Sequence, residues 1–299
     1  MNLPTVKQLR YFIALTEREH FGRAAESVFV SQSAFSVAIK DLETLLGVQL
    51  VDRTNKQVTI TTIGREIAEK ARHCVGEIEL LVDLAQCDQA PLTGTLKLGV
   101  IPTIAPFLLP KILPALRQRY PELKLYLVEE TTRRVYGRLM DGELDLILIA
   151  LPFALRNVEL HTLFQDPFLL AYRDGTRILD PDNYAVENLP DDSVLLLEDG
   201  HCLRDHALSA CHLNNPNQIS RFAASSLLTL VEMVEADMAI TYLPEMAEGT
   251  PLLKNTAVKT VALKEKSYRE IGLAWRRGSA RGDEFKLLGE LIKKYSGRA

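Results

Sequence analysis

The sequence predicts an α/β protein made of two unlike parts, a small helical domain and a larger, doubly wound domain with two lobes. Three observations carry this prediction. The 299 residues are too many for one compact core. Up to residue 86 apolar residues recur mainly at the spacing of amphipathic helices, whereas after residue 94 apolar runs alternate with such helices. The stretch 88–94 between them, which contains Pro91 and Gly94, predicts a hinge.

The first part predicts three short helices, a hairpin and a long helix. Apolar positions repeat every three or four residues through the helices, and Gly47 ends the third. Two β-prone runs flank a polar turn and predict a wing. The long helix has an apolar stripe without a core of its own, so we expect its copy in a dimer to cover it. The predicted helices span 5–19, 22–28, 31–46 and 62–86, and the hairpin spans 48–60.

The second part predicts apolar strands that alternate with helices, as in a doubly wound fold with two lobes. The predicted strands are 95–101, 123–129, 144–149, 167–172, 193–197, 239–242 and 271–275. The predicted helices are 105–119, 133–141, 227–236 and 283–294.

Composition excludes several classes of protein. Hydrophobic residues make up 47% and charged residues 25% of the chain, which is typical of globular proteins. No secretory signal is visible at the start, and lysines and prolines interrupt the most apolar stretch, 96–116, so we expect a cytoplasmic protein without a membrane span. The net charge of -4 gives no nucleic-acid signature. Four cysteines in a reducing compartment do not form a structural scaffold, so any disulfide should be reversible.

The predicted second and third helices have the pattern of a helix-turn-helix. Ala24 and Ala25 allow close packing, and the Ser31 hydroxyl suits the start of the third helix. Gln32 is of the type that pairs with adenine. A structural helical pair with a solvated polar face is the alternative, which cations in the wing make less favourable. The candidate DNA-binding residues are Ser31, Gln32, Ser33, Ser36, Lys40, Arg53 and Lys56.

Residues 4–64 resemble the winged helix-turn-helix of LysR-type transcriptional regulators. The resemblance implies a DNA-binding domain at 4–61, a linker and dimerisation helix with a hinge at 62–90, and a two-lobed effector domain at 91–299, similar to periplasmic binding proteins and with an inducer cleft. The matching residues are Leu9, Phe12, Ala24, Ala25, Ser31, Gln32, Ser33, Ala34, Ser36, Ile39, Leu42, Glu43, Gly47, Leu50, Arg53, Thr61 and Gly64.

A second resemblance lies in the run Glu-Asp-Gly-His-Cys-Leu-Arg-Asp at 198–205, followed by a cysteine nine residues after the first. This run is similar to that of the peroxide-sensing OxyR branch of the family. The resemblance implies that peroxide oxidises Cys202 and that Cys211 then forms a disulfide with it. Two buried, inert thiols are the alternative. Cys74 and Cys87 are expected to be packing or incidental residues, and a zinc site lacks a fourth ligand.

The residues around Cys202 bear on its chemistry. A peroxide-reactive thiol must be partly thiolate, and His201, Arg204 and His206 are expected to lower its pKa. A continuous helix over 202–211 would place the two Cα atoms about 13.5 Å apart, whereas a disulfide needs about 7 Å or less. Oxidation should therefore unwind the segment.

Other residues are candidates for the same peroxide pocket. Thr103 follows a strand and is either a helix cap or a site residue. Ser225, Ser226 and Arg269 are candidates through family similarity, although each suits local capping or pairing too. Asp205 is expected to orient Arg204 or a histidine.

The sequence therefore predicts a regulator of oxidative-stress genes that is not an enzyme and needs no cofactor or metal. Expected partners are inverted-repeat half-sites in double-stranded DNA, one or three further copies of the chain, RNA polymerase and a cellular thiol reductant, with hydrogen peroxide as the signal. One alternative is a LysR-type regulator that binds a small carboxylate near Thr103 and Ser225. Another is a thiol peroxidase, which would need a reductant site that the sequence does not suggest.

Overall fold

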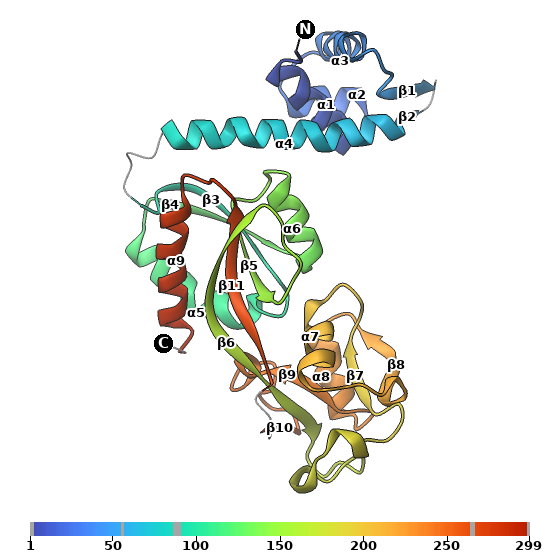
Figure 1. Cartoon of the computed structure of the whole chain (residues 1–299), viewed down its shortest axis with the longest axis vertical. Helices are drawn as coiled ribbons and strands as arrows, with labels where there is room; N and C mark the ends of the chain where they lie inside the picture. The colour runs from blue at the N-terminus through green and yellow to red at the C-terminus, as the bar shows by residue number, and fades with distance from the viewer. Residues whose placement is uncertain (1–2, 55–56, 86–90, 264–266, 298–299) are drawn as a thin grey trace. The chain divides into compact units, whose positions relative to one another are not determined.

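The computed structural model describes residues 3–54, 57–85, 91–263 and 267–297 (Figure 1). The chain divides into two compact units, the first formed mainly by residues up to Asp88 and the second mainly by residues from Gln89 onwards. None of the helices over the described residues is long and apolar enough to cross a membrane.

The first unit begins with three helices, α1 (Val6–Arg18), α2 (Phe21–Ser27) and α3 (Gln32–Leu46). Each helix has a polar side chain at its start: Thr5 and Gln8 form a capping box, His20 accepts from two amides, and Ser31 accepts from the Ala34 amide. Gly47 ends α3 with a φ of 69°, a left-handed conformation that favours glycine. Phe12, Phe35 and Ile39 lie at the centre of the core between the helices.

A hairpin and a long helix complete the first unit. Strands β1 (Val51–Thr54) and β2 (Gln57–Ile60) pair antiparallel as the predicted wing, and the Glu43 carboxylate accepts the amides of Leu50 and Val51. Helix α4 runs over Thr62–Ala85. Gly64 is required at its start because a Cβ there would lie 2.4 Å from the Leu50 carbonyl oxygen.

The second unit contains a seven-stranded sheet in the order β10-β6-β11-β5-β3-β4, with β9 also pairing with β6, and a separate pair β7-β8. Strands β6 and β11 are long and antiparallel, and they connect the strands of one lobe to those of the other (Figure 1). The strands are β3 (Gly94–Val100), β4 (Leu123–Glu129), β5 (Leu146–Leu151), β6 (Val158–Arg173), β7 (Val194–Leu197), β8 (Ile219–Ala224), β9 (Thr241–Pro244), β10 (Val258–Ala262) and β11 (Tyr268–Arg276).

Five helices and four short 3-10 turns are described in this unit. Helix α9 packs on β6 and β11, whereas α7 packs on β7 and β11. The helices are α5 (Ala105–Arg119), α6 (Thr132–Met140), α7 (Cys202–Ala210), α8 (Leu227–Glu235) and α9 (Gly282–Tyr295), and the 3-10 turns are Pro181–Asn183, Val186–Asn188, Pro216–Gln218 and Glu245–Ala247.

Four strands were not predicted or differ from the sequence prediction by more than two residues at one end. Strand β6 begins at Val158 rather than at 167, and β8 and β10 were not predicted. The first half of β6, and most of β8 and β10, are partly or fully exposed, so they lack the apolar runs that mark buried strands. Arg269 also lies within β11, whereas the prediction placed it before the strand.

Candidate functional site

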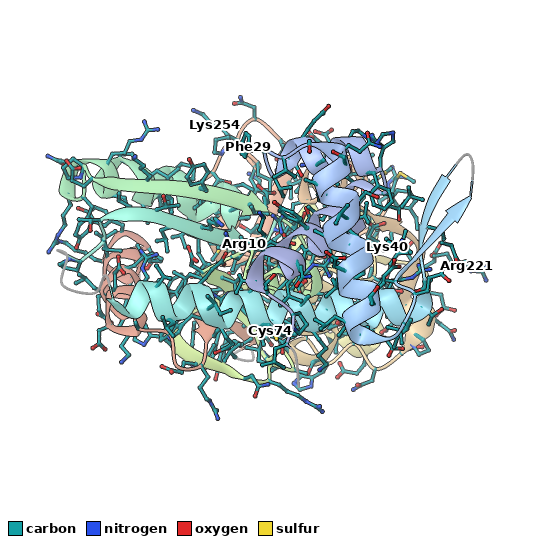
Figure 2. The ribbon with its side chains drawn as sticks, turned by 90° about the horizontal axis from the view of Figure 1, so that it is seen from above. Arg10, Phe29, Lys40, Cys74, Arg221 and Lys254 are labelled. Carbon is teal, nitrogen blue, oxygen red and sulfur yellow. The ribbon has the colours of Figure 1, made fainter. Side chains whose placement is uncertain are left out.

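The exposed face of α3 carries most of the predicted DNA-binding residues. Ser31, Gln32, Ser33 and Lys40 are exposed, and Ser36 is partly buried. The Ser31 hydroxyl caps the helix and lies 3.2 Å from that of Ser33. Lys40 extends from the same helix (Figure 2). The side chain of Arg53 in the wing and the whole of Lys56 lie outside the described residues.

The two predicted redox cysteines lie at opposite ends of α7. Cys202 is its first residue and Cys211 is its C-terminal cap, and both are free thiols. Both are buried, with exposed fractions of 7% and 5%. The segment is helical throughout, since the Cys211 amide still donates to the Ala207 carbonyl at 3.0 Å. Nine residues of helix therefore separate the two Cα atoms by about 13.5 Å along the helix axis.

Burial raises the pKa of the Cys202 thiol above its ordinary value. The strongest opposing influence is the Arg269 guanidinium, which favours the thiolate, followed by the Thr132 side chain; the exposed Asp205 carboxylate raises the pKa further. The buried Thr132 hydroxyl makes no hydrogen bond of standard geometry among the described residues. It therefore favours the thiolate because it lies near the sulfur, not through a fully formed hydrogen bond. The Ala150 backbone also favours the thiolate.

Arg269 is fully buried and anchored at every nitrogen. Its Nε pairs with Asp166 Oδ2 at 3.1 Å, Nη1 donates to Thr103 Oγ1 at 2.8 Å, and Nη2 donates to the Thr103 carbonyl at 2.8 Å and contacts Met246 Sδ at 3.6 Å. Arg269 and Asp166 are direct neighbours in the β11–β6 ladder. The guanidinium is thus a fixed cation inside the protein, close enough to act on Cys202.

Thr103 does not cap α5. Ile104 occupies the cap position of α5 without a side-chain bond, while the Thr103 hydroxyl accepts from Arg269 and keeps its own proton to donate elsewhere. Thr103 also lines a cavity of about 650 Å³ between strand ends and helix starts of both lobes. The cavity is lined by Pro102, Thr103, Pro106, Phe107, Glu129, Leu197, His201, Ser225, Ser226, Leu227, Leu228, Thr250, Pro251 and Leu252.

The structure brings His201, Ser225 and Ser226 to this cavity. His201 precedes α7 and does not cap it through its side chain. Ser226 caps α8 by accepting from the Thr229 amide, so it combines a local role with a place in the cavity wall.

Other predicted partners of Cys202 are arranged differently. Arg204 pairs with Asp199 at 3.1 Å and donates to the Leu197 carbonyl, so Asp199 rather than Asp205 orients it. The alternative, that Asp205 orients a histidine, stays a prediction. His206 Nε2 lies 2.9 Å from the Pro152 carbonyl oxygen, and burial lowers the pKa of its imidazole, which favours the neutral form.

The influences that lower the pKa of Cys202 come from Arg269, Thr132 and the Ala150 backbone. They do not come from His201, Arg204 and His206, as the sequence had suggested. Physically, the neutral His206 supplies no cation, and Arg204 is held by the loop before α7.

Cys211 lies in different surroundings. Burial raises the pKa of its thiol to about 12, and it lines a second cavity of about 390 Å³ beside Tyr184 and Ser267. Such a thiol is protonated at neutral pH and is a poor first nucleophile. Cys74 is exposed on α4 (Figure 2), and Cys87 lies outside the described residues.

Sequence reasoning missed Asp166, Thr132 and Met246. Asp166 stands in a strand whose polar first half hid it, and Thr132 begins a helix, where a threonine has an ordinary local role. No signal in the sequence alone pairs Asp166 with Arg269, because their adjacency depends on the register of β6 and β11. Among the described residues, no three His, Cys, Asp or Glu side chains gather as a metal site.

Fold and site together define a class of protein: a winged helix-turn-helix with an exposed polar recognition face, joined to a two-lobed α/β domain that has a cavity between its lobes. Residues 6–65 match the model of the bacterial regulatory helix-turn-helix protein, lysR family, and residues 89–296 match that of the LysR substrate binding domain. The chain belongs to the LysR family of DNA-binding transcription regulators.

Several relatives match nearly the whole chain. It is 36% identical over 293 residues to the HTH-type transcriptional regulator EstR of Acinetobacter baylyi, which covers 98% of this chain and 97% of EstR. It is 36% identical over 288 residues to the hydrogen peroxide-inducible genes activator of Escherichia coli O6:H1, covering 96% and 94%. A full-length OxyR from Pseudomonas aeruginosa, with a cysteine replaced by aspartate, has a TM-score of 0.80 at 32% identity, covering 98% and 96%.

Proposed function

We propose that this regulator senses hydrogen peroxide through a reversible disulfide between Cys202 and Cys211 and controls oxidative-stress genes. The observation that carries the proposal is the unequal pair of buried thiols at the two ends of one short helix. Cys202 lies within the influence of the Arg269 cation, whereas the pKa of Cys211 is raised to about 12 with no cation among its causes. Similarity to the hydrogen peroxide-inducible activator supports the same assignment.

The chemistry divides between the two sulfurs. The Cys202 thiolate attacks one peroxide oxygen, the O–O bond breaks, and hydroxide leaves and takes up the proton that the thiol lost, giving Cys202 sulfenic acid and water. The Cys211 sulfur then attacks the sulfenic sulfur, and a second water leaves as the disulfide forms. Two thiols of a cellular reductant reverse the step by becoming a disulfide themselves.

The peroxide pocket consists of Thr103, Thr132 and Arg269 around Cys202, with His201 and Ser225 on the side of the cavity. A hydroxyl that accepts from arginine and donates onward suits a peroxide oxygen. Negative charge that develops on the departing oxygen is stabilised by the nearby guanidinium.

The disulfide and the helix exclude each other. The Cα atoms of a disulfide lie within about 7 Å, which a helical separation of nine residues does not permit. Forming the bond therefore unwinds α7, which packs on β7 and on β11, the strand that carries Arg269. The signal passes in this way from one sulfur to strands shared by both lobes.

The DNA-binding domain at 4–61, the linker at 62–90 and the effector domain at 91–299 then work as one regulator. The apolar positions Ile78, Leu81 and Val82 are exposed on α4, which suits pairing with a second copy in a dimer or tetramer. A dimer reads two half-sites of an inverted repeat and presents the bound promoter to RNA polymerase.

The test is mass spectrometry of peroxide-treated full-length protein. Wild type should form a peptide linkage between Cys202 and Cys211 that dithiothreitol removes. Cys211→Ser should stop at Cys202 sulfenic acid, and Cys202→Ser should remain unmodified at Cys211. Cys74→Ser is the matched control and should behave as wild type. Peroxide-treated wild type without this linkage would contradict the proposal.

A second candidate function is the sensing of a small metabolite in the cavity of about 650 Å³. The size of this cavity suits a small organic ligand, and EstR, which is similar over 98% of this chain, is not named as a peroxide regulator. Under this alternative the cysteines do not respond. Peroxide should then leave the affinity for promoter DNA unchanged in both wild type and Cys202→Ser.

A further inference from the structure

We infer that Phe29 and Val37 contact the methyl groups of thymines in the DNA half-site and add a preference for this base to the polar reading by α3. The inference rests on the DNA-binding role of α3 and is independent of the cysteine chemistry. It concerns the two large apolar side chains that the structure exposes at this surface, with exposed fractions of 94% for Phe29 and 58% for Val37.

Phe29 occupies the turn between α2 and α3 in a costly conformation. Its φ is 57°, in the left-handed region, where a bulky side chain is an outlier and glycine or asparagine fits better. The turn requires this conformation, because the Phe29 amide donates to the Glu26 carbonyl and the Val30 amide to the Ala25 carbonyl. The ring gains nothing from burial to offset that cost. An exposed aromatic ring at a strained position therefore indicates a contact outside the chain.

Val37 lies on the second turn of α3, on the face away from the core. Its neighbours Phe35 and Ile39 are fully buried, whereas Ser33, one turn before it, and Lys40, one turn after it, are exposed. Side chains at this spacing share one helix face. Val37 is thus placed among the polar residues that are expected to face the DNA.

The polar surroundings identify the partner as DNA rather than another protein. A protein interface has a continuous apolar centre. Here Gln32 and Ser33 directly follow the turn that holds Phe29, and Lys40 lies one turn after Val37, so exposed donors suited to bases and phosphates accompany the two apolar side chains. In the major groove, the thymine methyl is the apolar group that phenylalanine and other apolar side chains read.

The experiment uses the full chain, reduced with dithiothreitol, and duplexes that wild type recovers from a random-sequence library. Affinities are measured for each recovered duplex and for the same duplex with uracil in place of thymine, which removes the methyl groups only. Wild type should lose roughly fourfold per contacted thymine. Phe29→Asn and Val37→Ser should bind the thymine duplex several-fold more weakly and respond less to uracil.

Leu3→Ala is the matched control, since Leu3 is an apolar side chain with 75% exposure that precedes α1, and it should behave as wild type. Asparagine tolerates the left-handed conformation, so the melting temperature of Phe29→Asn should not fall. Equal binding of wild type to the thymine and uracil duplexes would overturn the inference. So would a loss in Phe29→Asn that is the same for both duplexes. If Gln32→Ala weakens binding but Phe29→Asn and Val37→Ser do not, α3 still binds DNA and only the inferred contact with thymine is wrong.

Discussion

The helices α3 and α7 carry the candidate residues for DNA binding and for peroxide sensing, and their ends are built differently. Helix α3 has 15 residues, a Ser31 hydroxyl at its start and Gly47 at its end, whose amide donates to the Glu43 carbonyl at 2.9 Å. Helix α7 has 9 residues, no side-chain cap at His201 and no glycine at its end. Cys202 is the first residue of α7, and Cys211 is its C-terminal cap. We therefore expect α3 to be fixed at both ends, whereas α7 is held mainly by packing and should unwind more easily.

The largest effect is expected when the buried ion pair of Arg269 and Asp166 is broken. Arg269→Met leaves the Asp166 carboxylate buried without its cation, which should lower the free energy of unfolding by about 3 to 5 kcal/mol. Urea denaturation of the reduced protein measures this, and the oxidation of Cys202 should slow as well. Arg269→Met combined with Asp166→Leu should recover much of the stability but not the rate. A single variant as stable as wild type would show that the pair does not support the fold.

The pH dependence of oxidation should show that Cys202 reacts as a thiolate. Because burial raises its pKa, the thiolate is the minor form at neutral pH, and its fraction rises about tenfold per pH unit below that pKa. The rate of sulfenic acid formation should therefore increase as pH rises from 6 to 8, measured by stopped-flow fluorescence. Cys211→Ser should keep the same slope. A rate that is flat over this range would mean that the thiolate already predominates.

Removing the cap of α3 should affect only the DNA-binding part. Ser31→Ala should lower the stability of the first unit by about 1 kcal/mol and weaken DNA binding. The equilibrium between dithiol and disulfide, measured against glutathione buffers, should not change. Ser31→Asp retains a capping oxygen and should recover the stability. A shift in the redox equilibrium of Ser31→Ala would contradict the separation of the two helices.

The smallest effect should come from changing the helix propensity of α7 at the exposed Ser209. Ser209→Gly should shift the equilibrium toward the disulfide roughly twofold to threefold, and Ser209→Ala should shift it by a similar factor toward the dithiol. Glutathione titration gives both values, and Ser279→Gly, outside α7, serves as the control. If both Ser209 variants shift the equilibrium in the same direction, unwinding of α7 is not part of the redox step.

Most of the architecture was predictable from the sequence because it depends on local patterns. The ranges of α5 and β4 agree with their predictions, since periodicity and apolar runs determine them. Strands β8 and β10 lack such runs because their side chains are largely exposed. At the site, the motif indicated Cys202 and Cys211. It did not indicate that Arg269, 67 residues after Cys202 in the sequence, is the cation that acts on it, because that proximity arises from the packing of α7 on β11.

The ion pair of Arg269 and Asp166 has a mechanical consequence. It joins β11 and β6 where their partners change: β11 pairs with β5 from Glu270 onwards, and β6 pairs with β9 and β10 from Phe168 onwards. The guanidinium that favours the Cys202 thiolate therefore also holds β11 and β6 together at the boundary between the two lobes. Oxidation of Cys202 would change the chemical group beside this buried ion pair, so we expect the alignment of the lobes to respond to the chemical state of a single sulfur atom.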